Sequence, residues 1–315
     1  MFFPSGYYRA KARAALKGHW EIALLIALIV NLPSLLVQGI AVFTGNDLVD
    51  RLQAIVVTAS REGNYSQQLL VQEVRSFLQS TGFLTTQGLN IAAWLVTPCL
   101  ALGMYKWLLD LLRGQAGPVA TAVCRVKLFF KAIGLQLLII LKVLAWMLPG
   151  LAAAGLSLVP LFQAGNDQEK LLSALQTSNA MTLPVLLLMI VPGVIAALRY
   201  AMSEYILADE PDTRIRECVR TSKKLMQDQK KSLFFLMVSF LLWYLAQMLV
   251  ASMLSGLGSD IFSLMFQMLS GLALNVYMCG SVADFFLQLR GEETRVPDPA
   301  DVRENEDGPE DGAEG

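Results

Sequence analysis

Six ionisable side chains lie inside otherwise apolar stretches of the chain: Lys106, Asp110, Lys142, Arg199, Glu204 and Asp284. A charge in hydrocarbon is costly, so such residues pair with one another, line a polar cavity or bind an ion or solute. Lys142 is the most central of the six, about midway along its apolar stretch. It is a candidate counter-ion or ligand site, and the alternative is a lysine that pairs within the bundle or extends its amine to the membrane surface.

The other five residues lie nearer the cation-rich ends of their stretches. Lys106 and Asp110 are four residues apart, so on a helix they can form an ion pair. We expect Arg199 and Glu204 to link their stretch to a neighbouring helix. Together with Asp284, these residues predict either a polar pocket open to the cytoplasm or a set of purely structural contacts.

Sequence motifs of known enzymes and cofactor sites are missing. The chain has no H-E-x-x-H, no G-x-S-x-G and no glycine-rich phosphate loop. A single histidine, His19, excludes multi-histidine metal sites. The four cysteines, Cys99, Cys124, Cys218 and Cys279, are too far apart for a C-x-x-C pattern. We therefore expect no enzyme activity, no cofactor and no metal, and we expect free thiols rather than disulfides.

The composition is that of a protein built for lipid. Of 315 residues, 55% are hydrophobic and only 16% are charged, whereas about a quarter are charged in soluble domains. Two of the apolar stretches contain Pro149-Gly150 and Pro192-Gly193, where we expect breaks. The sequence predicts an all-α membrane protein whose six transmembrane helices form three hairpins, within a membrane domain over 1–291. The spans are expected at about 22–43, 89–112, 133–162, 183–207, 233–257 and 261–289.

A basic amphipathic helix is predicted before each pair of spans, over 5–17, 118–131 and 213–231. In the third, Ile215, Cys218, Val219, Ser222, Leu225 and Met226 share one face at helical spacing. We expect such helices to lie at the cytoplasmic water–lipid boundary with the apolar face in lipid. Their positions beside spans favour anionic lipid headgroups over nucleic acid. The predicted headgroup contacts are Arg9, Arg13, Lys17, Arg125, Lys127, Lys131, Arg216, Arg220, Lys223, Lys224, Lys230 and Lys231.

The distribution of cations predicts the orientation. Only Arg51, Arg61, Arg75 and Lys170 fall in loops on the side opposite the basic helices. The positive-inside rule therefore places both termini in the cytoplasm of a multi-pass plasma-membrane protein. Residues 44–88 form the predicted outer loop. Residues 292–315, rich in Asp, Glu, Pro and Gly, predict a disordered acidic cytoplasmic tail.

An internal repeat is suggested by two similar helix ends. The segments 103–114 and 280–291 have the same Gly-to-Gly spacing and both finish in Leu-Arg-Gly. They suggest three units, 5–114, 117–207 and 212–291, each with a basic helix and a hairpin. Chance similarity between apolar helices is the alternative.

Several short motifs resemble a known family. They are Pro192-Gly193-Val194-Ile195, Tyr200-Ala201-Met202, Leu207-Ala208-Asp209-Glu210-Pro211, Ser222-Lys223-Lys224-Leu225-Met226, residues 230–234 and residues 239–243. Near the start, Arg9, residues 14–18 and Trp20 fit as well, and so does Gly103-Met104-Tyr105. In these residues the chain resembles the bacterial integral-membrane family called domain of unknown function 975. The resemblance covers about residues 5–245 and implies the membrane topology but no activity.

Two roles are compatible with these features. The sequence favours a non-enzymatic scaffold or accessory factor that engages anionic lipid or a membrane-protein partner. The alternative is a small-solute or lipid transporter with a mid-membrane site near Lys142 and breaks at Pro149 and Pro192. A hydrophilic cavity reaching Lys142 would favour transport, whereas a tightly packed bundle would favour the scaffold.

Overall fold

A computed structural model of the chain describes residues 5–44, 75–76, 79–115, 117–120, 128–164, 168–256, 260–292 and 294, and within them the secondary structure is helical without strands. Most of the predicted outer loop, half of the predicted second basic helix and the tail after residue 294 lie outside the described residues. The main helices are α1 (Ser5–Leu16), α2 (Trp20–Thr44), α5 (Thr81–Leu112), α7 (Phe129–Ala164), α8 (Gln168–Tyr200), α9 (Ser203–Asp209), α10 (Ile215–Leu225), α11 (Lys230–Gly256) and α12 (Asp260–Leu289).

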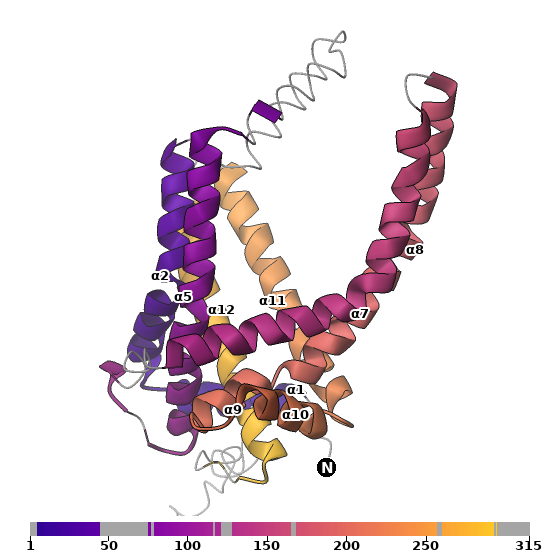
Figure 1. The fold of residues 1–315 in the computed structure, drawn as a ribbon. Coiled ribbons are helices and arrows are strands. Elements are labelled where there is room, and N and C mark those ends of the chain that lie inside the picture. The colour runs from indigo at the N-terminus through magenta and orange to yellow at the C-terminus, as the bar shows by residue number, and fades with distance from the viewer. Residues whose placement is uncertain are drawn as a thin grey trace, which may run out of the picture.

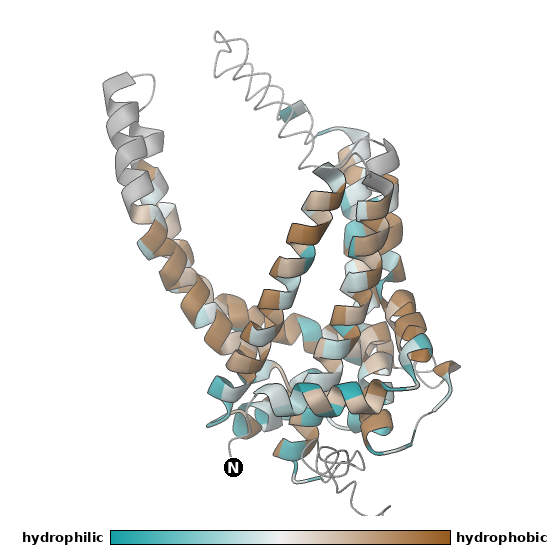
Figure 2. Cartoon of the chain, turned by 180° about the vertical axis from the view of Figure 1, so that it is seen from behind, coloured by the Kyte–Doolittle hydropathy of each residue, from teal (hydrophilic) through white to brown (hydrophobic). Residues whose placement is uncertain are grey.

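Six helical segments are long and apolar enough to cross a membrane. They belong to α2, α5, α7, α8 with α9, α11 and α12, so the predicted all-α class and the six candidate spans are confirmed. Hydrophobic residues cover most of these long helices, whereas hydrophilic residues gather at the end that carries the N-terminus (Figure 2). The chain is therefore a multi-pass membrane protein by the length and composition of its helices.

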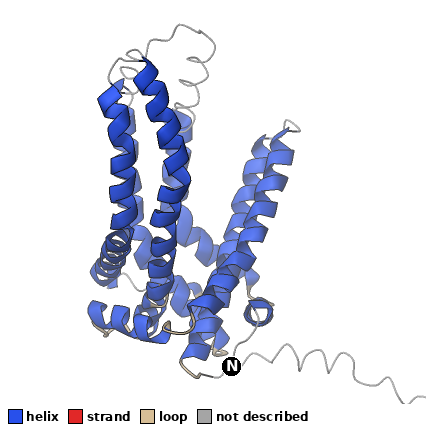
Figure 3. Cartoon of the chain, turned by 90° about the vertical axis from the view of Figure 1, so that its right-hand side faces the viewer, coloured by secondary structure: helices blue, strands red, loops and turns tan. Residues whose placement is uncertain are grey.

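The long helices pack mainly on their neighbours in sequence. α2 packs on α5, α7 on α8, and α11 on α12, while α12 also contacts α1, α2 and α5. The pair α7–α8 leans away from the other long helices (Figures 1 and 3). The short helices α1, α9 and α10 lie across one end, which we call the basic end (Figure 1).

The breaks predicted at the two Pro-Gly pairs are absent from α7 and α8. Helix α7 continues through Pro149-Gly150, and α8 continues through Pro192-Gly193 to Tyr200, so this prediction was wrong. A proline removes one backbone hydrogen bond, but an apolar environment penalises any further unfolding of the helix, and the helix curves instead (Figure 1). The chain breaks later, at Ala201-Met202, and the predicted fourth span ends in the separate helix α9.

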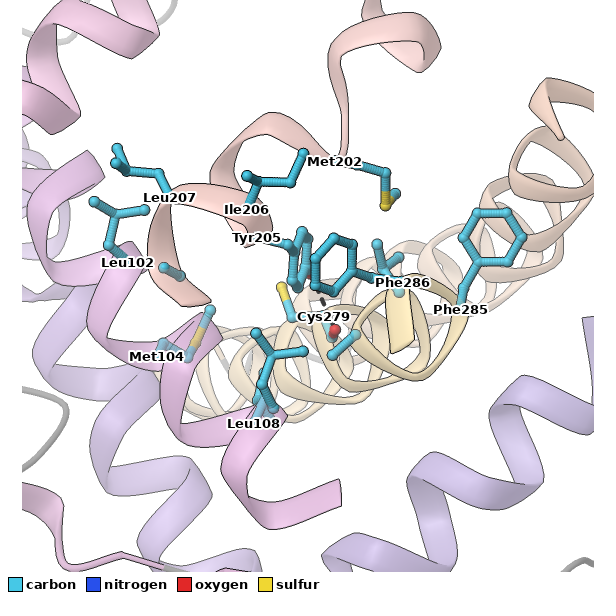
Figure 4. Packing of buried hydrophobic residues seen from close by; sticks show 14 of the residues in the cluster. Leu102, Met104, Leu108, Met202, Tyr205, Ile206, Leu207, Cys279, Phe285 and Phe286 are labelled. Atoms are coloured by element: carbon cyan, nitrogen blue, oxygen red, sulfur yellow. Dashed lines mark hydrogen bonds between the residues drawn. The ribbon is translucent and has the colours of Figure 1, made fainter. Parts of the chain in front are cut away.

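The densest part of the core lies at the basic end. Helix α9 contributes the buried Tyr205, Ile206 and Leu207 to this core, and the Tyr205 ring lies beside the fully buried Phe286 of α12, with centroids 5.9 Å apart (Figure 4). By contrast, only 6% of the apolar window of α7 is buried by protein, against 28% for α2 and α5. The pair α7–α8 therefore presents most of its surface outwards, and the basic end holds most of the buried core.

Close packing of α7 on α8 gives a test of this arrangement. A Cβ atom added at Gly150 would lie 2.5 Å from the Met189 Cα atom, whereas at Gly155 of the same helix it would meet nothing within 4 Å. We expect Gly150→Ala to destabilise the protein by about 1–3 kcal/mol because the backbones must separate. The matched control Gly155→Ala should leave stability unchanged or slightly raised. Thermal unfolding in detergent measures both, and equal behaviour of the two variants would contradict this packing.

Candidate functional site

Asp209, the last residue of α9, holds the ends of two other helices at the basic end. Arg113 donates from both terminal nitrogens to the two carboxylate oxygens, at 2.7 and 2.8 Å, and Arg290 donates to Oδ2 at 3.1 Å. The Asp209 side chain is only 11% exposed. A bidentate arginine–carboxylate pair of this kind is strong and fixes the orientation of both groups.

Four more charged groups extend this contact into a cluster, which we call the ionic hub. Lys106 Nζ lies 2.6 Å from Asp110 and 3.4 Å from Asp209. Arg113 also pairs with Glu292 at 2.7 Å, and Arg290 donates to Glu210. The hub therefore combines three cations, Lys106, Arg113 and Arg290, with the four carboxylates Asp110, Asp209, Glu210 and Glu292. Its charges are close to balanced within the protein.

The hydrogen bonds of the hub favour the charged forms of its members. The hydrogen bond to Asp209 raises the pKa of Arg113 above its usual value despite partial burial. The hydrogen bond from Arg290 lowers the pKa of Glu210 below its usual range. Both pKa shifts keep the side chain charged, as a structural ion pair requires. Neither brings the pKa closer to neutral pH, where a proton-transfer group would titrate. Within the described residues, no group of three or more His, Cys, Asp or Glu side chains is arranged to hold a metal ion.

A glycine with a positive φ ends each helix that contributes an arginine to the hub. Gly114, with φ of 74°, follows Arg113, and Gly291, with φ of 72°, follows Arg290. A left-handed glycine stops an α-helix and leaves the preceding side chain at its last turn. The two matching Leu-Arg-Gly endings of the sequence therefore have the same conformation and place both arginines on Asp209.

Three of the predicted intramembrane residues lie near the hub or in the core beside it. Lys106 and Asp110 form the expected pair and belong to the hub. Glu204 on α9 accepts a hydrogen bond from Tyr105, whose ring stacks on Tyr205 with centroids 4.5 Å apart. The Tyr205 hydroxyl donates to the Cys279 carbonyl oxygen at 3.0 Å (Figure 4). This polar contact ties α5, α9 and α12 together inside an apolar core.

Asp284 and Arg199 serve contacts elsewhere at the basic end. Asp284 is fully buried on α12, and Gln288 donates to its Oδ2 atom at 3.1 Å. Burial raises the pKa of Tyr8 on α1 to about 12, with a further contribution from the charge of Asp284. The Arg199 carbonyl accepts from Ser222 Oγ at 3.1 Å and so joins α8 to α10.

Lys142 lies beside the end of α8. Its Nζ atom is 5.9 Å from the ring centroid of Tyr200, the last residue of α8. The first part of α7 runs obliquely across the molecule, and the helix then turns to run with α8 (Figure 1). Within the described residues, Lys142 forms no ion pair with the other five predicted site residues. The mid-membrane position of Lys142 stays a prediction.

Protein covers the apolar face of α10. Cys218, Val219, Ser222 and Met226 are buried, and the helix contacts α7, α8 and α9. The expectation that this face lies in lipid was wrong. The same holds for α1, whose Leu16 is buried and which packs mainly on α12. An apolar stripe indicates that a face is covered, and here the cover is the bundle itself.

The opposite face of α10 is exposed and strongly basic. Arg214, Arg216, Arg220, Lys223 and Lys224 are exposed, and we call them the basic face. In the described part of the chain none of them forms an ion pair, in contrast to the cations of the hub. Glu217 is the exposed acid on the same helix. Five uncompensated cations on one rigid short helix attract anions.

The remaining predicted headgroup contacts have different surroundings. Lys131 on α7 donates to the Pro211 carbonyl oxygen at 2.7 Å, so it is engaged by protein. Arg13 lies over the Tyr277 ring, 5.9 Å from its centroid. The exposed members are Arg13, Lys17 and Lys231, and the half-buried members are Arg9 and Lys230. Arg125 and Lys127 lie outside the described residues.

An apolar groove of about 800 Å³ runs between α2, α11 and α12. Leu28, Leu254 and Phe266 are among its lining residues, and Glu21 is the charged residue that borders it. In a bilayer, acyl chains rather than water cover such a surface. The groove therefore adds to the lipid-facing surface of the molecule.

Sequence reasoning missed the hub residues whose partners lie far away in the sequence. Arg113, Asp209, Glu210, Arg290 and Glu292 were not predicted as site residues. The available signal was the repeated Leu-Arg-Gly ending together with an Asp-Glu pair before a proline. The predicted tail also begins too early, because Glu292 binds Arg113 and Thr294 Oγ1 accepts from Lys11 Nζ at 2.9 Å.

Comparison with known proteins identifies a family. The model of a family described as a protein of unknown function (DUF975) matches residues 5–293. No curated protein and no solved structure matches the chain.

The dominant role of Asp209 in the hub can be tested by removing its charge. Asp209→Asn leaves two arginines without their shared partner, and we expect a loss of about 2 kcal/mol or more, since hydrogen bonds to charged groups contribute about 1.5–3 kcal/mol each. Asp110→Asn is the matched control, because Asp110 is more exposed and has one close partner. Thermal unfolding in detergent should show the larger loss for Asp209→Asn. An equal or smaller loss would contradict the central position of Asp209.

Proposed function

We propose a role for this chain, which belongs to the DUF975 family of proteins of unknown function. The role is that of a non-enzymatic scaffold or accessory protein in the bacterial plasma membrane. It engages the headgroups of anionic lipids through the basic face of α10. A membrane-protein partner would be held in the bilayer beside that lipid.

One observation carries the proposal: the cations of the hub are paired, whereas those of the basic face are not. Asp209 and its neighbours neutralise Lys106, Arg113 and Arg290 within the protein. Arg216, Lys223 and the other members of the basic face keep their charges exposed. Each such cation near an anionic membrane surface contributes about 1 kcal/mol of attraction. The basic face is therefore a cluster of cations at the basic end that remains available to an anionic ligand.

The proposed topology places the basic end in the cytoplasm. Three helical hairpins then cross the membrane, each entered through a short helix on the cytoplasmic side, with both termini on that side. The cations at this end support it, because positively charged segments stay on the cytoplasmic side.

Cysteine labelling of cells tests the topology. Lys223 on α10 and Arg75 near the start of α5 are both exposed, while Cys99, Cys218 and Cys279 are buried free thiols. We expect an impermeant maleimide to label Lys223→Cys only after the membrane is permeabilised. Arg75→Cys should be labelled on intact cells. The reverse pattern would refute the proposed orientation.

Native mass spectrometry tests the lipid contact. The purified protein is equilibrated with equal amounts of phosphatidylglycerol and phosphatidylcholine, and the retained lipids are counted. We expect a preference for phosphatidylglycerol that falls by at least about tenfold when Arg216, Arg220, Lys223 and Lys224 are all changed to Gln. Four cations at about 1 kcal/mol each set an upper limit of about a thousandfold.

Glu217→Gln, on the same helix, is the control of opposite sign and should raise the preference. Retention of phosphatidylglycerol that none of these changes affects would refute the proposed contact. Replacement of the lipid by a copurified acidic protein would instead assign the basic face to that partner.

A further inference from the structure

We propose that the acidic tail of this chain covers the basic face of α10 and competes there with anionic lipid. This inference rests on the proposed function for its consequence, lipid binding, but the contact itself does not depend on it. The occupant is residues 295–315, which lie outside the described residues. The proposal stands on where the tail begins, on its length and on charge.

The start of the tail is fixed at the basic end. Glu292 pairs with Arg113 at 2.7 Å, and the Thr294 hydroxyl accepts from Lys11 Nζ at 2.9 Å. Lys11 is itself buried. Thr294, the last described residue, is therefore held by α1, and Glu292 is held by the hub. The tail therefore starts from a defined point rather than from a free helix end.

A short path of contacts joins this point to the basic face. Arg113, the partner of Glu292, binds Asp209, and the adjacent Glu210 accepts a hydrogen bond from Thr213 Oγ1 at 3.2 Å. Thr213 immediately precedes Arg214, the first cation of the basic face. The tail thus begins a few side chains away from the N-terminal end of α10.

Length sets no obstacle to docking. Fully extended, the residues 295–315 span about 70 Å at about 3.3–3.6 Å per residue. Helix α10 is about 16 Å long at 1.5 Å per residue. The chain can therefore pass the hub and follow the whole basic face in an extended form.

Charge selects the basic face as the docking surface. The residues 295–315 contain eight acidic residues against Arg295 and Arg303. The cations of the hub already have carboxylate partners, whereas the five cations of the basic face have no ion-pair partner among the described residues. A tethered acidic segment has a high effective concentration beside such a surface. Anionic lipid headgroups seek the same cations, so the two ligands exclude each other.

Cross-linking in the full-length protein tests the contact directly. Glu310→Cys carries a photoreactive label, and mass spectrometry locates the cross-linked peptide. We expect cross-links to residues 214–225 that disappear when Arg216, Arg220, Lys223 and Lys224 are changed to Gln. They should also fall in about 0.5 M salt, which screens exposed charges. Cross-links elsewhere, or ones that these changes leave intact, would overturn the proposal.

Lipid competition is measured with a neutral tail. Changing the eight acids to amides should tighten phosphatidylglycerol binding about tenfold if the tail occupies the basic face nine-tenths of the time, because apparent affinity scales with the open fraction. A shuffled tail of the same composition is the matched control and should leave binding as in the wild type. The changed acids are Asp298, Asp301, Glu304, Glu306, Asp307, Glu310, Asp311 and Glu314.

The two measurements separate the two proposals. Cross-links to α10 without any binding of phosphatidylglycerol would leave the tail contact in place and refute the lipid function. Lipid binding that the neutral tail does not change, with no cross-links to α10, would refute the tail contact and leave the lipid function standing.

Discussion

The structure depends on the convergence of three helix ends on one carboxylate. Helices α5, α9 and α12 finish beside one another, and the end of each carries a partial negative charge from its unpaired carbonyl groups. Asp209 adds a full negative charge at the same place. Arg113 and Arg290 compensate for both effects, since each stands at the last turn of its own helix and binds Asp209. Without these two cations the three ends would repel one another.

The internal pairing of charges in the hub explains how α10 becomes a platform. Contacts with α7, α8 and α9 bury Cys218, Val219 and Ser222, and this fixes the rotation of the helix. The acids of the hub are engaged by the hub cations and are not available to the basic face. A fixed helix with exposed and uncompensated cations is thereby presented at one end of a membrane bundle.

Sequence patterns predicted the helical class and the candidate spans because length and apolarity suffice for these. They also predicted which face of α10 is covered, but not by what, because lipid and protein are equally apolar partners for Val219. Asp209 was missed because its partners lie 96 and 81 residues away in the sequence. Helical spacing carries no information over such separations. The breaks expected at Pro149 and Pro192 failed because a rule from aqueous helices does not hold where unfolding exposes backbone to hydrocarbon.

The wide spacing of the hub residues along the chain has a consequence for biogenesis. Arg113 is synthesised well before Asp209, and Arg290 comes near the end of the last long helix. Membrane domains emerge from the ribosome in N-to-C order. The cluster therefore closes only when the sixth hydrophobic segment has been inserted, and a truncated or stalled chain retains a carboxylate with only part of its cationic shell. Completion of the last helix is the step that distinguishes a finished molecule from an unfinished one.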